Sequence, residues 1–429
     1  NQVTSETDAE GNVTRFEYDA RGNLTKLIDA EANETVFAYD AQGWLTSTTD
    51  PRGNTTTYGL DAAGNLTSIT DALGNTATLT YDAVGNLTSI TDAEGRTTTF
   101  EYDGLNRRTK ITDAFGAETT FAYDPNGNIT VITDPRGNTT TSTYDSRNRL
   151  TVTTNALSQT EIRGYDANGN LTSVTDVAGN TKTHDYNAAD QLVSATRPGS
   201  AVYQYEYDNV GNRTAVVDPT GVRAEQTYDP VDRSIALVAS NGDLEAYSYD
   251  RLGNQTSTQR KDGSDQLYYS ETLTYDALSR AVQTVAGMGQ TTDLDYDGNG
   301  NLATIVDPLG RTATRTYDAL DRISQLTDTA SGITQYAYDR VGNLTSVSDG
   351  EGLVTEYSYD ALNRLTQLRS PDTGITTASH DANGNLTEQT DSRGVTVTHA
   401  YDALDRRTST TFPTEGEDRT YLYDQGINL

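Results

Sequence analysis

The sequence of 429 residues contains no cysteine, one methionine, one tryptophan and three histidines. The absence of cysteine excludes disulfides and thiolate metal sites. No apolar run approaches the ~20 residues of a membrane-spanning helix and no signal peptide is recognisable, so we expect no membrane insertion. Basic residues are also scarce: 31 Lys and Arg stand against 62 Asp and Glu, giving a net charge of −31. This acidity repels nucleic-acid phosphates, and we expect no nucleic-acid partner.

The composition and the residue order favour different states of the chain. A hydrophobic content of only 34% and the high net charge are typical of disordered chains. However, the sequence holds 27 tyrosines and many threonines, which favour β-strands. The order also has a fixed period, which a disordered chain has no reason to keep. We therefore expect a folded repeat protein.

The period is marked by a Tyr-Asp pair, as in "YDAVGNLTSITDAEGRTTTFEYD" from Tyr81 to Asp103. Successive marks lie 21 residues apart, except for intervals of 26 residues from Tyr249 to Tyr275 and 22 residues from Tyr401 to Tyr423. The marks are residues 18, 39, 60, 81, 102, 123, 144, 165, 186, 207, 228, 249, 275, 296, 317, 338, 359, 380, 401 and 423. The sequence thus predicts a single array, residues 1–429, of about twenty units, with an irregular longer unit at 250–275.

Each unit contains two turn signals, and the commonest form is D-x-x-G, as in Asp82 to Gly85 and Asp92 to Gly95. An aspartate at the first turn position accepts hydrogen bonds from nearby backbone N–H groups, and a glycine at the fourth supplies a positive φ. This pattern predicts a hairpin connection made of a type I turn and a left-handed glycine. Where glycine is missing, Asn or Asp usually replaces it, and both tolerate that conformation. Those positions are Asn106, Asn148, Asp190, Asp232, Asp321, Asn363 and Asp405; Ser158 and Ser279 fit less well.

The segments between turns predict strands of six or seven residues. Thr98, Phe100 and Tyr102 alternate with polar or small residues and should share one face. Leu87 and Ile90 lie three residues apart and would face opposite sides of a regular strand. This spacing leaves two interpretations open, a β-bulge or partial burial of both faces.

About forty strands at ~4.8 Å each make a sheet ~190 Å wide. Open twisted sheets rarely exceed about ten strands without curling, so we expect a spiral or tube. Successive repeat tyrosines, such as Tyr81, Tyr102 and Tyr123, should lie two strands apart, roughly 9.6 Å. This distance predicts that each tyrosine packs on the intervening strand. A single 21-residue unit cannot offset its own ordering entropy, so each hairpin needs its neighbours.

The repeat resembles the YD repeat of the Rhs family over essentially the whole chain, from Thr4 to Asp424. "YDALNRLT" at 359–366 and "YDALDRRT" at 401–408 are especially close to the family wording. The resemblance implies a hollow spiral of β-hairpins. In bacterial Rhs proteins and insecticidal toxin complexes such a spiral encloses a toxin, in animal teneurins it serves adhesion, and wall-associated relatives are linked to carbohydrate binding. The core and toxin segments of bacterial shells are not recognisable here, so we expect part of a longer chain or a polymer subunit.

The sequence does not favour an enzyme or a cofactor. His184, His380 and His399 show no metal-binding spacing, and no GxSxG is present. Asp293, Asp295 and Asp297 imitate the start of a calcium loop, but Thr304 stands where such a loop has its bidentate glutamate. We expect no catalytic, cofactor or metal site. The arginines that follow the Asn or Asp turns are expected to pair with neighbouring aspartates. They are Arg107, Arg149, Arg233, Arg322, Arg364 and Arg406.

The 26-residue interval carries an Asp262-Gly263 hairpin signal and two adjacent tyrosines, Tyr268 and Tyr269. One interpretation is a longer hairpin that protrudes from one rim, and the other is a contact point for a partner or a glycan. Three functional hypotheses follow for this non-catalytic, extracellular or surface protein, which we expect to be bacterial. It is the wall of a shell around a toxin or other cargo, a filament that pairs edge strands with itself or with flanking repeats, or an adhesin that binds surface carbohydrate.

Overall fold

The computed structural model describes residues 2–414 and 417–423. Every regular element in that part of the chain is a β-strand, and forty strands form one sheet. Each strand pairs antiparallel with the strand that follows it in the chain, from β1–β2 to β39–β40. The predicted all-β array of hairpins is confirmed. None of the described residues forms a helix that could cross a membrane.

The strands alternate between two kinds. From β2 to β38, each even-numbered strand ends at the repeat mark. These strands are β2 Val13–Tyr18, β4 Glu34–Tyr39, β6 Thr55–Leu60, β8 Thr76–Tyr81, β10 Thr97–Tyr102, β12 Glu118–Tyr123, β14 Thr139–Tyr144, β16 Thr160–Tyr165, β18 Thr181–Tyr186, β20 Ala201–Tyr207, β22 Arg223–Tyr228, β24 Leu244–Tyr249, β26 Leu267–Tyr275, β28 Thr291–Tyr296, β30 Thr312–Tyr317, β32 Ile333–Tyr338, β34 Val354–Tyr359, β36 Gly374–His380, β38 Thr396–Tyr401 and the final β40 Arg419–Thr420.

The odd-numbered strands are mostly five residues long and begin after the turn that follows the mark. They are β1 Ser5–Thr7, β3 Leu24–Ile28, β5 Leu45–Thr49, β7 Leu66–Thr70, β9 Leu87–Thr91, β11 Arg108–Thr112, β13 Ile129–Thr133, β15 Leu150–Thr154, β17 Leu171–Thr175, β19 Leu192–Arg197, β21 Arg213–Val217, β23 Ser234–Val238, β25 Gln255–Lys261, β27 Ala281–Ala286, β29 Leu302–Val306, β31 Ile323–Thr327, β33 Leu344–Ser348, β35 Leu365–Ser370, β37 Leu386–Thr390 and β39 Arg407–Thr411. We call the turn after an even strand the tyrosine turn and the turn after an odd strand the distal turn.

The tyrosine turn between β8 and β9 shows the geometry common to the units. The Gly85 N–H donates to the Asp82 carbonyl at 3.1 Å, and the Asp82 N–H donates to the Asn86 carbonyl at 2.9 Å. The Asp82 carboxylate accepts from the backbone N–H groups of Val84 at 3.0 Å and Asn86 at 2.8 Å. Gly85 has a φ of +92°. This is a type I turn closed by a left-handed glycine, and Asp92 and Gly95 repeat it in the next distal turn.

A β-bulge accounts for the three-residue spacing of Leu87 and Ile90. Tyr81 pairs with Leu87, and Leu79 pairs with Ile90, but the register shifts by one residue between these pairs. Because Leu79 and Tyr81 lie two apart on one strand, the bulge places Leu87 and Ile90 on the same face of the sheet. The same shift recurs at the other hairpins that close on a tyrosine turn. Of the two interpretations left open by the sequence, the bulge is confirmed.

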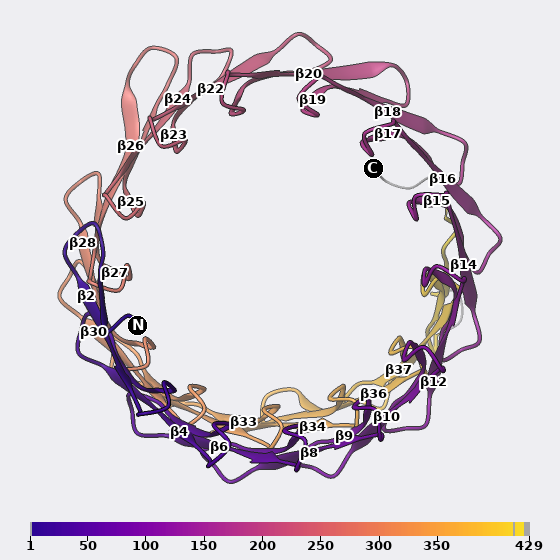
Figure 1. The fold of residues 1–429 in the computed structure, drawn as a ribbon, viewed down its shortest axis with the longest axis horizontal. Helices are drawn as coiled ribbons and strands as arrows, with labels where there is room; N and C mark the ends of the chain where they lie inside the picture. Colours follow the sequence, from indigo (N-terminus) through magenta and orange to yellow (C-terminus); the bar gives the residue numbers. More distant parts are fainter. Residues whose placement is uncertain (1, 415–416, 424–429) are drawn as a thin grey trace.

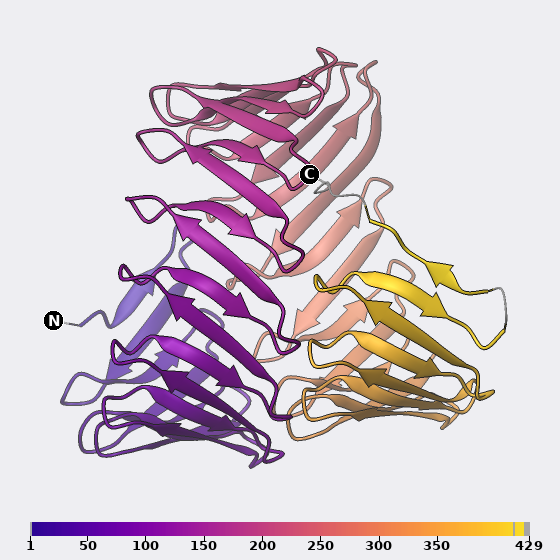
Figure 2. The same cartoon turned by 90° about the vertical axis from the view of Figure 1, so that its right-hand side faces the viewer.

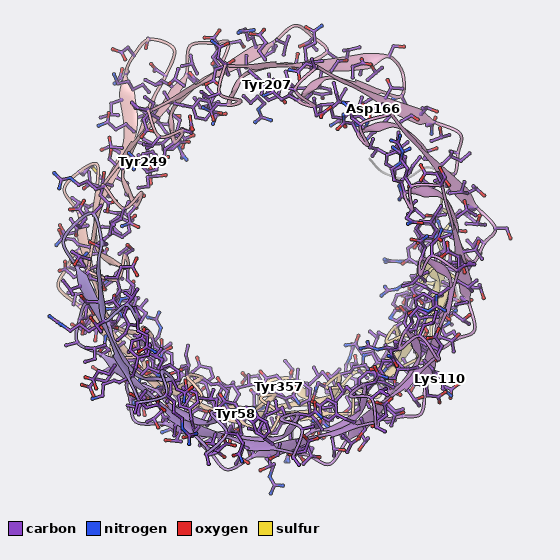
Figure 3. All side chains as sticks on the ribbon, viewed as in Figure 1. Tyr58, Lys110, Asp166, Tyr207, Tyr249 and Tyr357 are labelled. Carbon is purple, nitrogen blue, oxygen red and sulfur yellow. The ribbon has the colours of Figure 1, made fainter. Side chains whose placement is uncertain are left out.

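The sheet coils into a hollow ring with strongly overlapping ends (Figure 1). Its successive coils lie side by side along the spiral axis (Figure 2). Tyr58, Tyr207 and Tyr357 lie toward the hollow, so the tyrosine face of the sheet lines the lumen (Figure 3). Because the sheet is a single layer, almost no described side chain is fully buried, and the tyrosine face is half-buried by packing along the sheet itself. The predicted spiral is confirmed.

Candidate functional site: the ties along the wall and the seam between its coils

The repeat tyrosines tie each even strand to the strand before it. The Tyr102 hydroxyl donates to the carbonyl of Leu87 at 2.9 Å, and the Tyr81 hydroxyl donates to that of Leu66 at 3.0 Å. Both carbonyls belong to the first residue of the intervening odd strand, which is where the strand spacing predicted that the tyrosines would pack. The same bond recurs from Tyr18 to Tyr423 along the described spiral. Each phenol thus bonds the backbone and covers it with an aromatic ring.

Side chains link the tyrosine turns in an alternating series. The Asn86 amide donates to the Asn106 side chain of the next unit at 3.0 Å, and the Arg107 guanidinium then donates to the Asp124 carbonyl of the following unit at 3.0 Å. The amide link recurs from Asn128 to Asn148 and from Asn170 to Asp190. The structural period is therefore two units. The sequence analysis missed it, although G-N turns alternate with N-R or D-R turns over much of the chain.

The predicted arginine–aspartate pairs form, and each arginine makes further contacts. Arg149 donates to the Asp145 carboxylate at 2.7 Å within its own turn and to the Asp166 carbonyl at 2.8 Å in the next. Its guanidinium also lies 4.7 Å from the centre of the Tyr165 ring. Arg107, Arg233 and Arg322 repeat this arrangement. Each arginine bridges two units, which an isolated surface ion pair does not do.

A seam joins one coil to the next. Distal turns of the first coil contact tyrosine turns that lie 23 or 25 strands further along, as the β5–β6 turn contacts the β28–β29 and β30–β31 turns. At ~4.8 Å per strand, 23 strands correspond to a circumference of at least about 110 Å. The contacts run along the coil at Glu10 with Arg251, Glu31 with Arg280, Arg52 with Asp321, Arg96 with Asp360, Phe115 with Arg364, and Arg136 with Asp405.

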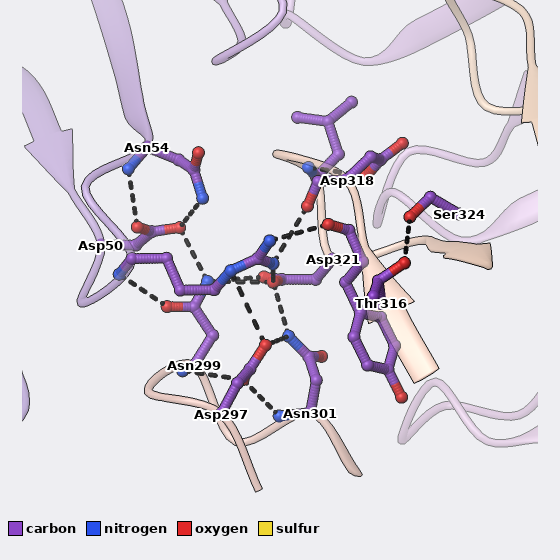
Figure 4. Close-up of polar contacts among 12 residues, drawn as sticks. Asp50, Asn54, Asp297, Asn299, Asn301, Thr316, Asp318, Asp321 and Ser324 are labelled. Carbon is purple, nitrogen blue, oxygen red and sulfur yellow. Dashed lines mark hydrogen bonds and ion pairs between the residues drawn. The ribbon is translucent and has the colours of Figure 1, made fainter. Parts of the chain in front are cut away.

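The most extensive seam contact inserts Arg52 between the tyrosine turns of Asp297 and Asp321 in the second coil. Figure 4 shows these two turns beside Asp50. The Arg52 guanidinium donates to the Asp321 carboxylate at 2.8 Å, to the Tyr317 carbonyl at 2.8 Å and to the Asp318 carbonyl at 3.0 Å. In the opposite direction, the Asn299 amide donates to the Asp50 carboxylate at 2.7 Å. The Arg52 side chain is only 23% exposed. These charge-assisted bonds fix the position of one coil against the other.

The same arrangement recurs four units later. Arg136 donates to the Asp405 carboxylate at 2.9 Å, and the Asn383 amide donates to the Asp134 carboxylate at 2.8 Å. Both inserted turns have the sequence D-P-R-G-N, at 50–54 and 134–138. Both receiving sites combine a D-x-N-G-N turn with the aspartate of a D-A-L-D-R turn. The identical pentapeptides were a signal for the seam that the sequence analysis did not use.

Hydrogen bonding keeps the turn and seam carboxylates ionised. The Asn86 side-chain amide, with help from backbone N–H groups, lowers the pKa of Asp82. At the seam, burial opposes ionisation of Asp50, but the hydrogen bonds from Asn299 and Asn54 outweigh it and lower its pKa. The pKa of Asp134 is lowered in the same way, with Asn383 and Asn138 as hydrogen-bond donors. Asp50 and Asp134 belong to the inserted turns, so each ionised carboxylate accepts a hydrogen bond from an asparagine amide of the other coil.

Tyr268 and Tyr269 lie on β26, which is nine residues long and pairs with the seven-residue β25 to form the longest hairpin of the described chain. Tyr268 is 65% exposed and borders a shallow cavity of about 390 Å³, which Leu267, Met288 and Gln290 also line. Tyr269 lies under the Arg260 guanidinium at 4.9 Å and donates to Glu271. The structure thus shows the protruding hairpin, and a partner at this place stays a prediction.

The histidines and the calcium-like aspartates lie in ordinary repeat positions. His380 takes the tyrosine position at the end of β36, and the His399 ring nitrogen lies 3.1 Å from the Thr410 hydroxyl. Asp293 and Asp295 project from the face opposite the tyrosines, and Asp297 caps its own turn through the N–H groups of Asn299 and Asn301. Within residues 2–414 and 417–423, no group of three His, Asp or Glu side chains could hold a metal ion.

The fold and the seam define a class, the hollow wall made of one coiled sheet of β-hairpin repeats. The family model described as RHS Repeat matches residues 1–34, 39–76, 81–120, 123–160, 165–202, 186–223, 275–312, 296–334, 338–375 and 380–417. The chain belongs to the Rhs repeat family. Most matched segments span nearly two of the 21-residue units. No curated protein sequence matches the chain.

Two solved structures share the fold. The crystal structure of TcdB2-TccC3-Cdc42 is similar with a TM-score of 0.56 and 16% identity, over 96% of this chain and 24% of that one. The Photorhabdus luminescens Tc holotoxin pore, with the mutation TccC3-D651A, is similar with a TM-score of 0.56 and 14% identity, over 95% of this chain and 26% of that one. This chain thus spans about a quarter of the length of either matched chain. It is a structural repeat shell.

Proposed function

We propose that the chain is the non-enzymatic wall of a secreted or cell-surface bacterial protein, and that its hollow encloses a cargo such as a toxin. The observation that carries the proposal is the seam. A coiled sheet without lateral contacts would be an open spring, whereas Arg52 and Arg136 hold adjacent coils together and close the wall between them. Continuous strand pairing closes the wall along each coil. The similarity to a Tc holotoxin supports a toxin as the cargo class.

The test places an unfolded reporter segment after Leu429 and measures its cleavage by a protease that leaves the wall intact. We expect cleavage to be at least tenfold slower than for the free reporter. The double variant Arg52→Ala and Arg136→Ala opens the seam and should restore fast cleavage. The control variant Arg369→Ala removes an arginine of the outer face, 65% exposed, and should keep the protection. Equal cleavage of the attached and the free reporter would exclude enclosure.

A second candidate, carbohydrate binding, is favoured by the exposure of Tyr268 beside a shallow cavity. Exposed aromatic faces stack on sugar rings, and the nearby Gln290 and Glu271 supply polar groups. The test is binding of the chain to polysaccharides of bacterial and host surfaces. Replacement of Tyr268 and Tyr269 by alanine should weaken any binding at least tenfold. Unchanged binding would exclude this hairpin as the site.

A further inference from the structure

The receiving half of the seam occurs a third time, on a tyrosine-turn rim that no described segment covers. Asp166, Asn168, Asn170 and Asp190 stand at the positions of Asp297, Asn299, Asn301 and Asp321. Their geometry is the same as in the occupied sites. The Asn168 amide donates to Asp190 at 2.9 Å and the Asn170 amide at 2.7 Å, against 2.9 Å for Asn299 and 2.7 Å for Asn301 to Asp321. The third receptor is therefore preformed.

This third receptor lies in the first coil, whose tyrosine turns face away from the second coil (Figure 2). The carbonyls that accept from Arg52 in the occupied site are those of Tyr317 and Asp318. Their counterparts are the carbonyls of Tyr186 and Asn187. Within residues 2–414 and 417–423, every hydrogen bond of Asn168, Asn170 and Asp190 stays within its own turn or between neighbouring units of this coil.

The inserted half of the seam also occurs a third time, on the opposite free rim. The distal turn from Asp391 to Gly394 has the sequence D-S-R-G, and Arg393 stands at the third position, as Arg52 and Arg136 do. It belongs to the second coil, and its side chain is 78% exposed, against 23% for Arg52 and 24% for Arg136. In the described chain it pairs with Asp391 of its own turn.

We propose that a second copy of this chain docks its Arg393 turn onto the receptor formed by Asp166, Asn168 and Asp190. The chain carries the inserted half on one free rim and the receiving half on the other, so the contact is head-to-tail and its repetition builds a stack of tubes. The occupant shares the aspartate, arginine and glycine positions of the two turns that this receptor's copies bind inside the chain. The inference needs the coiled wall but not the cargo, so the reporter experiment can fail while this one succeeds.

The experiment is sedimentation velocity of the purified chain over a concentration series at about 0.15 M salt. The Debye length is then about 8 Å, so repulsion between two chains of net charge −31 is screened while a close ion pair survives. The wild-type chain should form a series of species that grows with concentration. The variant Arg393→Ala loses the inserted group, and Asp190→Asn loses the receptor charge. Each alone should weaken association at least tenfold.

Asp190→Asn keeps the fold, because asparagine takes this turn position naturally at Asn148 and Asn363 with φ of +61°. Arg369→Ala, which removes the same charge from the outer face, should associate like wild type. An equimolar mixture of Arg393→Ala and Asp190→Asn has one intact junction per pair of chains, so it should form dimers and no longer species. A wild-type chain that stays monomeric would overturn the proposal. So would association of either variant at wild-type strength, which would assign assembly to edge-strand pairing instead.

Discussion

At the residue scale, the turn positions decide the fold more than the apolar residues do. A single-layer sheet has almost no buried core, so its stability is distributed over turns, ties and strand pairs. The left-handed fourth turn position is the strictest of these. It is occupied by glycine at Gly85, with a φ of +92°, and by asparagine at Asn106, with a φ of +61°.

We predict that Gly85→Val lowers the free energy of unfolding by ~1–3 kcal/mol, because a β-branched residue is strained at positive φ. Gly85→Asn should cost less than ~1 kcal/mol, since asparagine already serves in this position at Asn106. Val84→Ala, at a side chain 71% exposed, should change stability by no more than ~0.5 kcal/mol. Urea unfolding of the three variants measures the order of their stability losses. Equal losses for all three would contradict the turn assignment.

The tyrosine ties make a second prediction at this scale. Tyr102→Phe removes the hydroxyl that donates to the Leu87 carbonyl and keeps the ring. We expect a loss of ~0.5–1.5 kcal/mol, the usual net value of one hydrogen bond. Tyr102→Ala removes the ring as well and should cost more than Tyr102→Phe. The loss should stay below the ~3–5 kcal/mol of a fully buried aromatic ring, because this ring is only half-buried. A Tyr102→Phe variant as stable as wild type would show that the bond contributes nothing.

At the scale of the element, the working unit is a pair of hairpins. The D-x-x-G signals and their Asn or Asp variants predicted the hairpins and their turns, because turn geometry is a local property of a few residues. The odd strands are mostly five residues long, shorter than the six or seven predicted. The bulge after the tyrosine turn could not be chosen from sequence, since Leu87 and Ile90 also fit burial of both faces. The two-unit alternation of Asn and Arg is visible in the sequence, but it predicts links only when adjacent turns are known to touch.

The prediction at this scale concerns the bridging arginines. Arg149→Ala removes a bond to Asp145, a bond to the Asp166 carbonyl and a contact with the Tyr165 ring. We expect the free energy of unfolding to fall by about 1–3 kcal/mol, since hydrogen bonds to charged groups contribute more to stability than neutral ones. Arg149→Lys should recover only part of it, because an ammonium cannot make the two-sided contact. Arg340→Ala, in an exposed turn, serves as the control. A similar loss for both arginines would contradict the bridging role.

At the scale of the whole molecule, the seam and the turn carboxylates govern when the wall holds together. The sequence predicted the coil from sheet width alone, but not how many strands make one coil. That number depends on contacts between residues 241 to 269 positions apart, such as Arg52 and Asp321, and no local pattern encodes them. The receptor could not be predicted for a related reason, because it combines two successive turns of one coil and binds a turn that comes from another coil.

The turn carboxylates predict acid sensitivity. Asp82, Asp103 and Asp50 are among the many turn aspartates whose pKa lies below the ordinary value of 3.8 in the folded chain. A lowered folded-state pKa stabilises the fold above the unfolded pKa of about 3.9, and this contribution disappears as pH falls through the folded-state values. We therefore expect the melting temperature to be steady from pH 7 to pH 5 and to fall steeply below about pH 4. A melting temperature that is constant down to pH 2.5 would contradict this.

One engineered crosslink tests whether the sheet closes on itself along the seam. A Cβ built on Gly298 would lie 3.4 Å from the Cβ of Pro51, 247 positions away in the chain and close to the usual Cβ separation of a disulfide. Because the chain has no cysteine, the double variant Pro51→Cys and Gly298→Cys has a single way to form an intramolecular disulfide. The account predicts near-complete crosslinking under mild oxidation, seen as a shifted band on a non-reducing gel. The mismatched pair Pro51→Cys and Ala382→Cys should stay reduced. Absence of the crosslink in the first variant, with both thiols reactive, would contradict the closed spiral.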